Sequence, residues 1–156
     1  MNKKEQELTT KIEFRIIEIK KISYFEKDFL EFELKEEDIA HGNLALGLEL
    51  KIDGEQGVLS FIVKANFYYN KDSENYELFG VQALYRFQVK DFKSSFACNK
   101  VGEYKIPDGL MLTFLDISIS GTRGMLSVLN TNPAYRKVIL PLVDKQQLLS
   151  SLKKRT

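Results

Sequence analysis

The amino-acid sequence predicts an α+β fold, with a four-stranded antiparallel sheet formed as a meander, followed by a long helix and a C-terminal helix. Three observations support this class. Apolar and polar residues alternate up to Val89, turn residues separate the alternating segments, and apolar residues recur every three or four positions after Pro107. Strands therefore come first and helices last, which is the order typical of α+β domains.

Length and composition indicate one domain spanning residues 1–156. Hydrophobic residues make up 44% of the chain and charged residues 29%, values typical of a globular protein with its own core. Lys and Arg number 23 against 22 Asp and Glu, so the formal charge is +1. Because no strong field attracts phosphate, we expect no nucleic-acid partner. The cationic tail from Lys153 to Arg155 suits a helix C-terminus.

The first 34 residues contain two strand candidates. From Lys11 to Phe25 the apolar residues alternate, but the phase shifts twice, which indicates a strand with bulges. Leu30, Phe32 and Leu34 alternate with glutamates and predict a second, short strand. An acidic turn follows, from Lys35 to Asp38.

Three long segments give the clearest pattern. Apolar residues occupy every second position in 44–52, 59–69 and 79–89. The turns between them, 53–57 and 70–75, are short and rich in Asp, Asn and Gly. Parallel strands need long crossovers, so short turns predict antiparallel pairing.

The second face of these strands is half apolar. Polar residues such as Ser60, Lys64 and Gln82 alternate there with bulky ones. Such a face is too apolar to be freely solvated and too polar for a core, so we expect another subunit or a ligand to cover part of it. The candidate client-binding or subunit-contact residues are Val58, Ile62, Tyr68, Leu78 and Leu84.

Helical spacing begins after a short connection, 91–98. Pro107 and Asp108 suit a first helical turn, and apolar residues continue at helical spacing to Leu129, which predicts one long helix over 108–130. Residues 138–143 contain Pro141 and are expected to be extended. Asp144 is a suitable N-cap for a last helix over 145–154.

The sequence lacks the residues that most catalytic or metal sites require. His41 is the only histidine and Cys98 the only cysteine, which excludes an intrachain disulfide and argues against a zinc site and a nucleophile with an adjacent base. Gly121 to Gly124 lacks the ending of a phosphate-binding loop, so these glycines are expected to allow close helix packing. We expect no enzyme activity, no cofactor and no metal.

The protein is expected to be cytoplasmic. A single cysteine fits a reducing compartment. The charged start from Met1 to Gln6 does not resemble a secretory signal, and no apolar run is long enough to insert into a membrane.

Several short strings, in order along the chain, resemble the SecB-type export chaperones and SecB-like chaperones. Residues 14–26, FRIIEIKKISYFE, are similar to that family's first strand, and residues 58–89 to its central hairpin. Ile117 and Ser118, followed by 122–124, resemble its helix, while 140–143 resemble the entry to its last helix. The family's Phe-Pro-Tyr-Ala-Arg string is absent.

The resemblance implies an ATP-independent holdase that binds unfolded polypeptides, for protein export or for one dedicated client such as an antitoxin. It also implies a homotetramer, a dimer of dimers, in which Phe79, Val81 and Ala83 fall on the strand that influences assembly. Family members are acidic and bind the motor SecA; this chain is neutral, so that partnership is not expected. The alternatives are a small-molecule or lipid carrier and an adaptor without chaperone activity.

Overall fold

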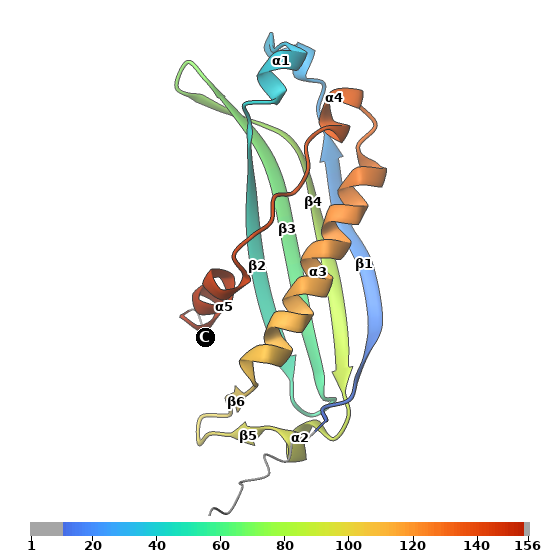
Figure 1. Ribbon diagram of the computed structural model, residues 1–156, viewed down its shortest axis with the longest axis vertical. Helices are drawn as coiled ribbons and strands as arrows, with labels where there is room; N and C mark the ends of the chain where they lie inside the picture. Colours follow the sequence, from blue (N-terminus) through green and yellow to red (C-terminus); the bar gives the residue numbers. More distant parts are fainter. Residues whose placement is uncertain (1–10, 155–156) are drawn as a thin grey trace, which may run out of the picture.

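The computed structural model describes residues 11–154 and confirms the predicted α+β fold (Figure 1). Its sheet contains β1 (Phe14–Glu26), β2 (Asn43–Asp53), β3 (Val58–Lys71) and β4 (Glu74–Val89), in the order β1-β4-β3-β2. All neighbours are antiparallel. The sequence features at 1–6 and at Arg155 lie outside the described residues.

The meander consists of β2, β3 and β4, and β1 adds to it as an edge strand beside β4. The two phase shifts expected in β1 are confirmed as register shifts, one between Ile16 and Glu18 and one between Lys21 and Ser23. Each shift turns a new set of side chains toward the helices, because strand side chains alternate between faces. Two edges of the sheet, β1 and β2, therefore have one side without a neighbouring strand.

The prediction of a short strand at Leu30–Leu34 is wrong. The chain forms a 3-10 helix, η1 (Phe29–Phe32), and then a helical turn, α1 (Glu36–Ile39). The Asp28 carboxylate accepts the Leu30 N–H at 3.0 Å, and Glu33 ends the turn with a φ of 56°. Local hydrogen bonding of Asp to nearby backbone competes with strand pairing, and a three-residue alternation is too short to resist it.

After β4 come α2 (Phe92–Ser95) and a small hairpin, β5 (Ala97–Cys98) with β6 (Tyr104–Lys105). The long helix α3 (Asp108–Leu129) is confirmed, and so is the last helix α5 (Lys145–Lys153), in which Asp144 caps Gln146 and Gln147. The short helix α4 (Pro133–Arg136) lies between them. Among the described residues, no helix is both long and apolar enough to cross a membrane.

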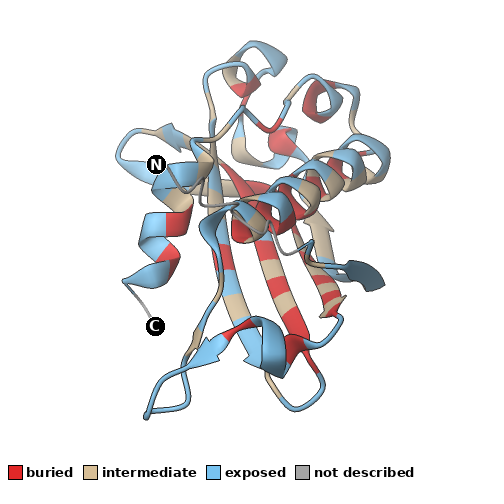
Figure 2. Cartoon of the chain, turned by 60° about the horizontal axis from the view of Figure 1, so that its bottom comes forward, coloured by how far each residue is buried: buried red, intermediate tan, exposed pale blue. Residues whose placement is uncertain are grey.

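One layer of helices lies on one face of the sheet, and α3 packs on β3 and β4 (Figure 1). Figure 2 shows that burial alternates along the central strands, as the predicted period of two requires. A Cβ on Gly121 would lie 2.7 Å from the Tyr85 ring, so glycine is needed for this close approach. Tyr85 and Thr122 share a buried hydrogen bond of 3.0 Å beside it.

The end of β1 is fastened to the start of α4 by Glu26. Its carboxylate accepts the Thr131 N–H at 2.8 Å, the Thr131 hydroxyl at 2.7 Å and the Asn132 N–H at 2.9 Å. The Tyr24 hydroxyl also donates to it. Burial acts to raise the pKa of Glu26, but these donors outweigh it and lower the pKa below its usual range.

We predict that stability falls as the pH drops through the lowered pKa of Glu26, because the ionised form is the one held by the fold. Glu26→Gln should lose about 1.5–3 kcal/mol of unfolding free energy at pH 7, the usual contribution of hydrogen bonds to a charged group. It should also flatten the acid limb of the stability curve. Urea unfolding at several pH values measures both effects.

Glu49→Gln is the matched control, because Glu49 is exposed on β2. This variant should keep the wild-type stability and acid limb. Equal losses in the two variants would contradict a specific role of Glu26.

Candidate protein-interaction site

The edge strand β1 carries an unusual set of exposed apolar side chains. Ile19, at its centre, is 52% exposed. The members of this set, called the β1 stripe below, are Phe14, Ile16, Ile17, Ile19 and Ile22. Isolated exposed apolar residues are ordinary, whereas a contiguous group on an unpaired strand edge indicates a binding surface.

Three of the five residues predicted on the second face stay partly exposed, and two of these three lie together. Ile62 and Leu84 are half-buried and lie opposite each other in register on β3 and β4. Tyr68 is half-buried farther along β3, opposite Glu77. These three can reach a partner.

The other two predicted residues, Val58 and Leu78, are buried in the single chain. For Leu78 the cause is a register shift, because Phe67 pairs with Phe79 and Tyr68 pairs with Glu77, which leaves Leu78 as the extra residue of a bulge. Its side chain joins the core cluster, and its carbonyl accepts the Lys27 N–H at 2.8 Å. Assigning every second residue of a strand to the same face cannot detect such a shift.

Phe79, Val81 and Ala83, the predicted assembly strand, belong to the core cluster and are buried. Their side chains pack inside the chain; Phe79, for example, stacks on Phe67 with ring centroids 4.9 Å apart. Any effect of this strand on assembly would therefore act through the position of β4.

Two open cavities lie at opposite ends of β2. One of about 850 Å³ is lined mainly by α1, the start of β2 and the segment after α4, and includes Leu44, Phe67 and Ile139. The other, of about 530 Å³, is lined mainly by the end of β2, β6 and α5, and includes Ile52 and Leu149. Open cavities with apolar side chains can take an apolar segment of another chain or a small molecule.

An extended segment, residues 138–143, runs from α4 toward α5 across the helical face (Figure 1). We call it the strap. The Arg123 guanidinium donates to two of its carbonyls, Leu140 at 3.0 Å and Pro141 at 3.3 Å. Within residues 121–124, Gly121 allows the close helix packing that the sequence predicts, and Arg123 makes the contact with the strap. Gly124 has no such packing role, because a Cβ there would meet nothing within 4 Å.

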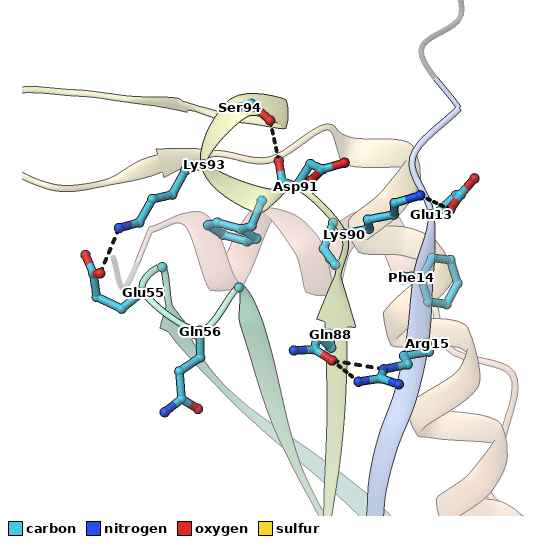
Figure 3. A pocket seen from close by; sticks show the side chains of 14 residues that line it. Glu13, Phe14, Arg15, Glu55, Gln56, Gln88, Lys90, Asp91, Lys93 and Ser94 are labelled. Carbon is cyan, nitrogen blue, oxygen red and sulfur yellow. Dashed lines mark hydrogen bonds and ion pairs between the residues drawn. The ribbon is translucent and has the colours of Figure 1, made fainter.

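A polar cleft of about 770 Å³ lies near the junction of β4 and α2 (Figure 3). Its charged side chains pair with one another: Lys93 with Glu55 at 2.7 Å and Lys90 with Glu13 at 3.1 Å. Arg15 donates to the Gln88 amide oxygen at 2.9 and 2.6 Å. These groups neutralise or satisfy one another, so the cleft presents no concentrated charge to a ligand.

Residues for metal or nucleophilic chemistry do not gather in the described part of the chain. Residues 11–154 contain no group of His, Cys, Asp and Glu that could hold a metal ion. His41 and Cys98 are both exposed and come from separate elements. The surfaces with exposed or half-buried apolar side chains are the β1 stripe, the second face and the two cavities along β2.

Comparison with known proteins does not assign a family. No family model and no curated protein matches the chain. A solved structure, a protein of unknown function from Streptococcus agalactiae, is 17% identical and has a TM-score of 0.30. The match covers 85% of this chain and 99% of that one.

Two features of these surfaces, the exposed apolar residues of β1 and the contact of Arg123 with the strap, were not predicted from the sequence. The apolar residues of β1 predict a strand. They also occur on both sides of two bulges, so they cannot all face the helices, which indicates that some must remain exposed. Arg123 gave no such signal, because its partners are backbone carbonyls 17 and 18 residues away.

We predict that Leu78→Ala lowers the unfolding free energy by about 2–5 kcal/mol, the usual cost of removing a buried leucine side chain. Leu84→Ala, a matched change on the same strand, should cost only about 1 kcal/mol because Leu84 is half-buried. Urea denaturation measures both. The assignment of Leu78 to the core is wrong if the two costs are equal.

Proposed function

We propose that this protein is an ATP-independent chaperone that holds non-native polypeptide segments and works as a homo-oligomer. The observation that carries the proposal of an oligomer is the β1 stripe, five apolar side chains exposed on a strand with a free edge, and the open cavities along β2 support the holding of clients. An edge of this kind is a template for another extended chain, which contributes backbone hydrogen bonds and apolar contacts. The resemblance to SecB-type chaperones supports the same function.

The charge pattern of β1 favours a second copy of the chain as the occupant of this edge. Glu18 and Lys20 lie on the second face, opposite Arg86 and Leu84, and Ile19 lies on the helical face, opposite Tyr85. An antiparallel pair centred on Ile19 puts Glu18 of each copy opposite Lys20 of the other. Opposite charges across strands stabilise a pair, and like charges destabilise it.

Neighbouring two-fold registers are less favourable. A pair centred on Glu18 would place two glutamates face to face, and one centred on Lys20 would place two lysines face to face. A shift by a single residue would place Ile19 opposite a lysine or a glutamate and turn the helices of the two copies to opposite faces. The register about Ile19 places Ile19 opposite Ile19, pairs opposite charges beside it, and joins the two sheets into one with their helices on the same face.

With β1 occupied by a second copy, the cavities at the ends of β2 remain for client segments. Both are open and have several apolar lining residues, among them Ile39, Leu44 and Phe67 in one and Leu50, Ile52 and Met111 in the other. Such surfaces bind many sequences, because burial of apolar area is not directional. No nucleotide is needed for holding of this kind.

We predict that the purified protein has at least twice the mass of one chain by size-exclusion chromatography with light scattering. Lys20→Glu should weaken the association more than tenfold, because it sets four carboxylates together across the pair. Lys51→Glu, the same substitution on the opposite edge strand, should leave it unchanged. A wild-type monomer at micromolar concentration contradicts the β1 pairing.

We predict that the protein suppresses aggregation of an unfolded model protein at one chain per client chain, without ATP. Ile52→Lys should reduce this suppression severalfold, because a charge in the cavity at the end of β2 opposes apolar clients. Leu30→Lys is the control, since Leu30 is exposed outside both cavities. Light scattering during dilution from denaturant measures the effect.

Absence of suppression by the wild-type protein contradicts the chaperone proposal. In that case, a small molecule or lipid that copurifies with the chain would identify the carrier function that the sequence left as an alternative.

A further inference from the structure

The strap resembles a bound client in its chemistry. Its sequence, Val-Ile-Leu-Pro-Leu-Val, is apolar throughout, and its backbone is extended without regular secondary structure. Pro141 and the residue before it favour extended backbone, which limits the entropy lost on holding the segment in place. A holdase that binds extended apolar segments would recognise such a sequence.

Few contacts hold the strap in place. Leu140 is only 3% exposed and joins the core cluster, whereas Ile139 and Leu142 are 71% and 92% exposed. Among residues 11–154, the hydrogen bonds found for 139–143 are the two that Arg123 donates to the carbonyls of Leu140 and Pro141. The ends of the strap, Val138 and Val143, are partly buried against the core, and the Val138 N–H donates to the Tyr135 carbonyl at 3.0 Å. Between them, one buried side chain and one arginine hold a segment that exposes two large apolar side chains.

The strap lines one of the two cavities along β2, and α5, which follows it, lines the other. Val138, Ile139 and Pro141 line the cavity near the start of β2, and Leu149 and Leu152 of α5 line the cavity near its end. Between these cavities, β2 turns Leu46 and Leu48 toward the core. From Leu44 to Leu48 the strand is about 14 Å long, enough for a client segment of about five residues in extended form.

We propose that the strap is a displaceable occupant of the client site, latched by Arg123, and that a client segment enters by replacing it. This inference rests on the proposed function and adds its regulation. When the strap is in place, Leu140 fills the space beside the cavity near the start of β2. When it leaves, that cavity extends along β2 toward α5 as a groove, and the guanidinium of Arg123 becomes free to bind the carbonyls of the client.

Competition within the same chain has a quantitative consequence. A client that needs the open groove binds with an apparent dissociation constant equal to its intrinsic value divided by the fraction of chains with the strap displaced. A change that loosens the strap and leaves the groove intact must therefore tighten the binding of an external segment.

The test uses a fluorescein-labelled peptide with the sequence of residues 137–144 and the full-length protein. We expect Leu140→Ser to bind this peptide at least tenfold more tightly than the wild type, measured by fluorescence anisotropy. Leu142→Ser makes the same substitution on the same strap, at a side chain that is almost fully exposed. It should stay within twofold of the wild type. Equal affinities of the two variants would overturn the proposal.

A second measurement needs no variant and so does not depend on Leu140→Ser folding correctly. Excess peptide added to the wild-type protein should lower the ¹⁵N heteronuclear NOE of the backbone amides in 139–143, apart from Pro141, because the displaced segment moves on the nanosecond timescale, and leave the values in α3 unchanged. Unaltered or higher values in the strap would overturn the proposal.

The outcomes also separate this inference from the proposed function. If the wild type suppresses aggregation but the peptide neither mobilises the strap nor competes with it, the chaperone function stands and the strap is a fixed element. If the peptide displaces the strap but aggregation is not suppressed, the site binds a specific segment and the general holdase function fails.

Discussion

The structure depends on a mismatch of width between its sheet and its main helix. Four strands about 4.8 Å apart form a sheet roughly 19 Å wide, whereas one helix with its side chains covers roughly 10–12 Å. Helix α3 lies on the central strands β3 and β4, where Gly121 lets it approach the ring of Tyr85. Both edge strands are therefore left for other elements to cover.

The chain covers only one of these edges well. At β2, α5 packs against the strand and the strap crosses nearby (Figure 1). At β1, Glu26 fastens the end of the strand to the start of α4, but the apolar stripe along its length remains exposed. The exposed apolar area thus follows from the geometry of the layers, and its position on an unpaired edge is what suits it to another polypeptide.

The sequence allowed the sheet and the two main helices to be predicted because their signals are long. Alternation over ten or more residues identifies a strand, and Asp144 identifies the start of α5 by its capping chemistry. The failures are local. At 30–34 the predicted strand is replaced by a 3-10 helix that Asp28 caps. At Leu78 a bulge moves the side chain to the opposite face from the one that alternation along β4 predicts.

The candidate site was harder to predict than the fold, because it depends on what the helical layer fails to cover. Ile62, Tyr68 and Leu84 could be placed on the second face by counting, since long strands keep their phase. The strap could be predicted as extended from Pro141, but its attachment to Arg123 depends on tertiary structure alone. Alternation along a strand reports which side chains can share a face, whereas exposure depends on the width of the layer packed above it.

The two edges differ in a way that bears on mechanism. A second copy on β1 would gain backbone hydrogen bonds along the strand together with paired charges, so that contact is suited to permanence. Between its partly buried ends, Val138 and Val143, the strap on the β2 side has two hydrogen bonds from one arginine and one buried leucine, which suits exchange. A protein built from these two edges would assemble through the first and exchange segments at the second. Assembly would then also protect the β1 stripe from the clients that the β2 groove holds.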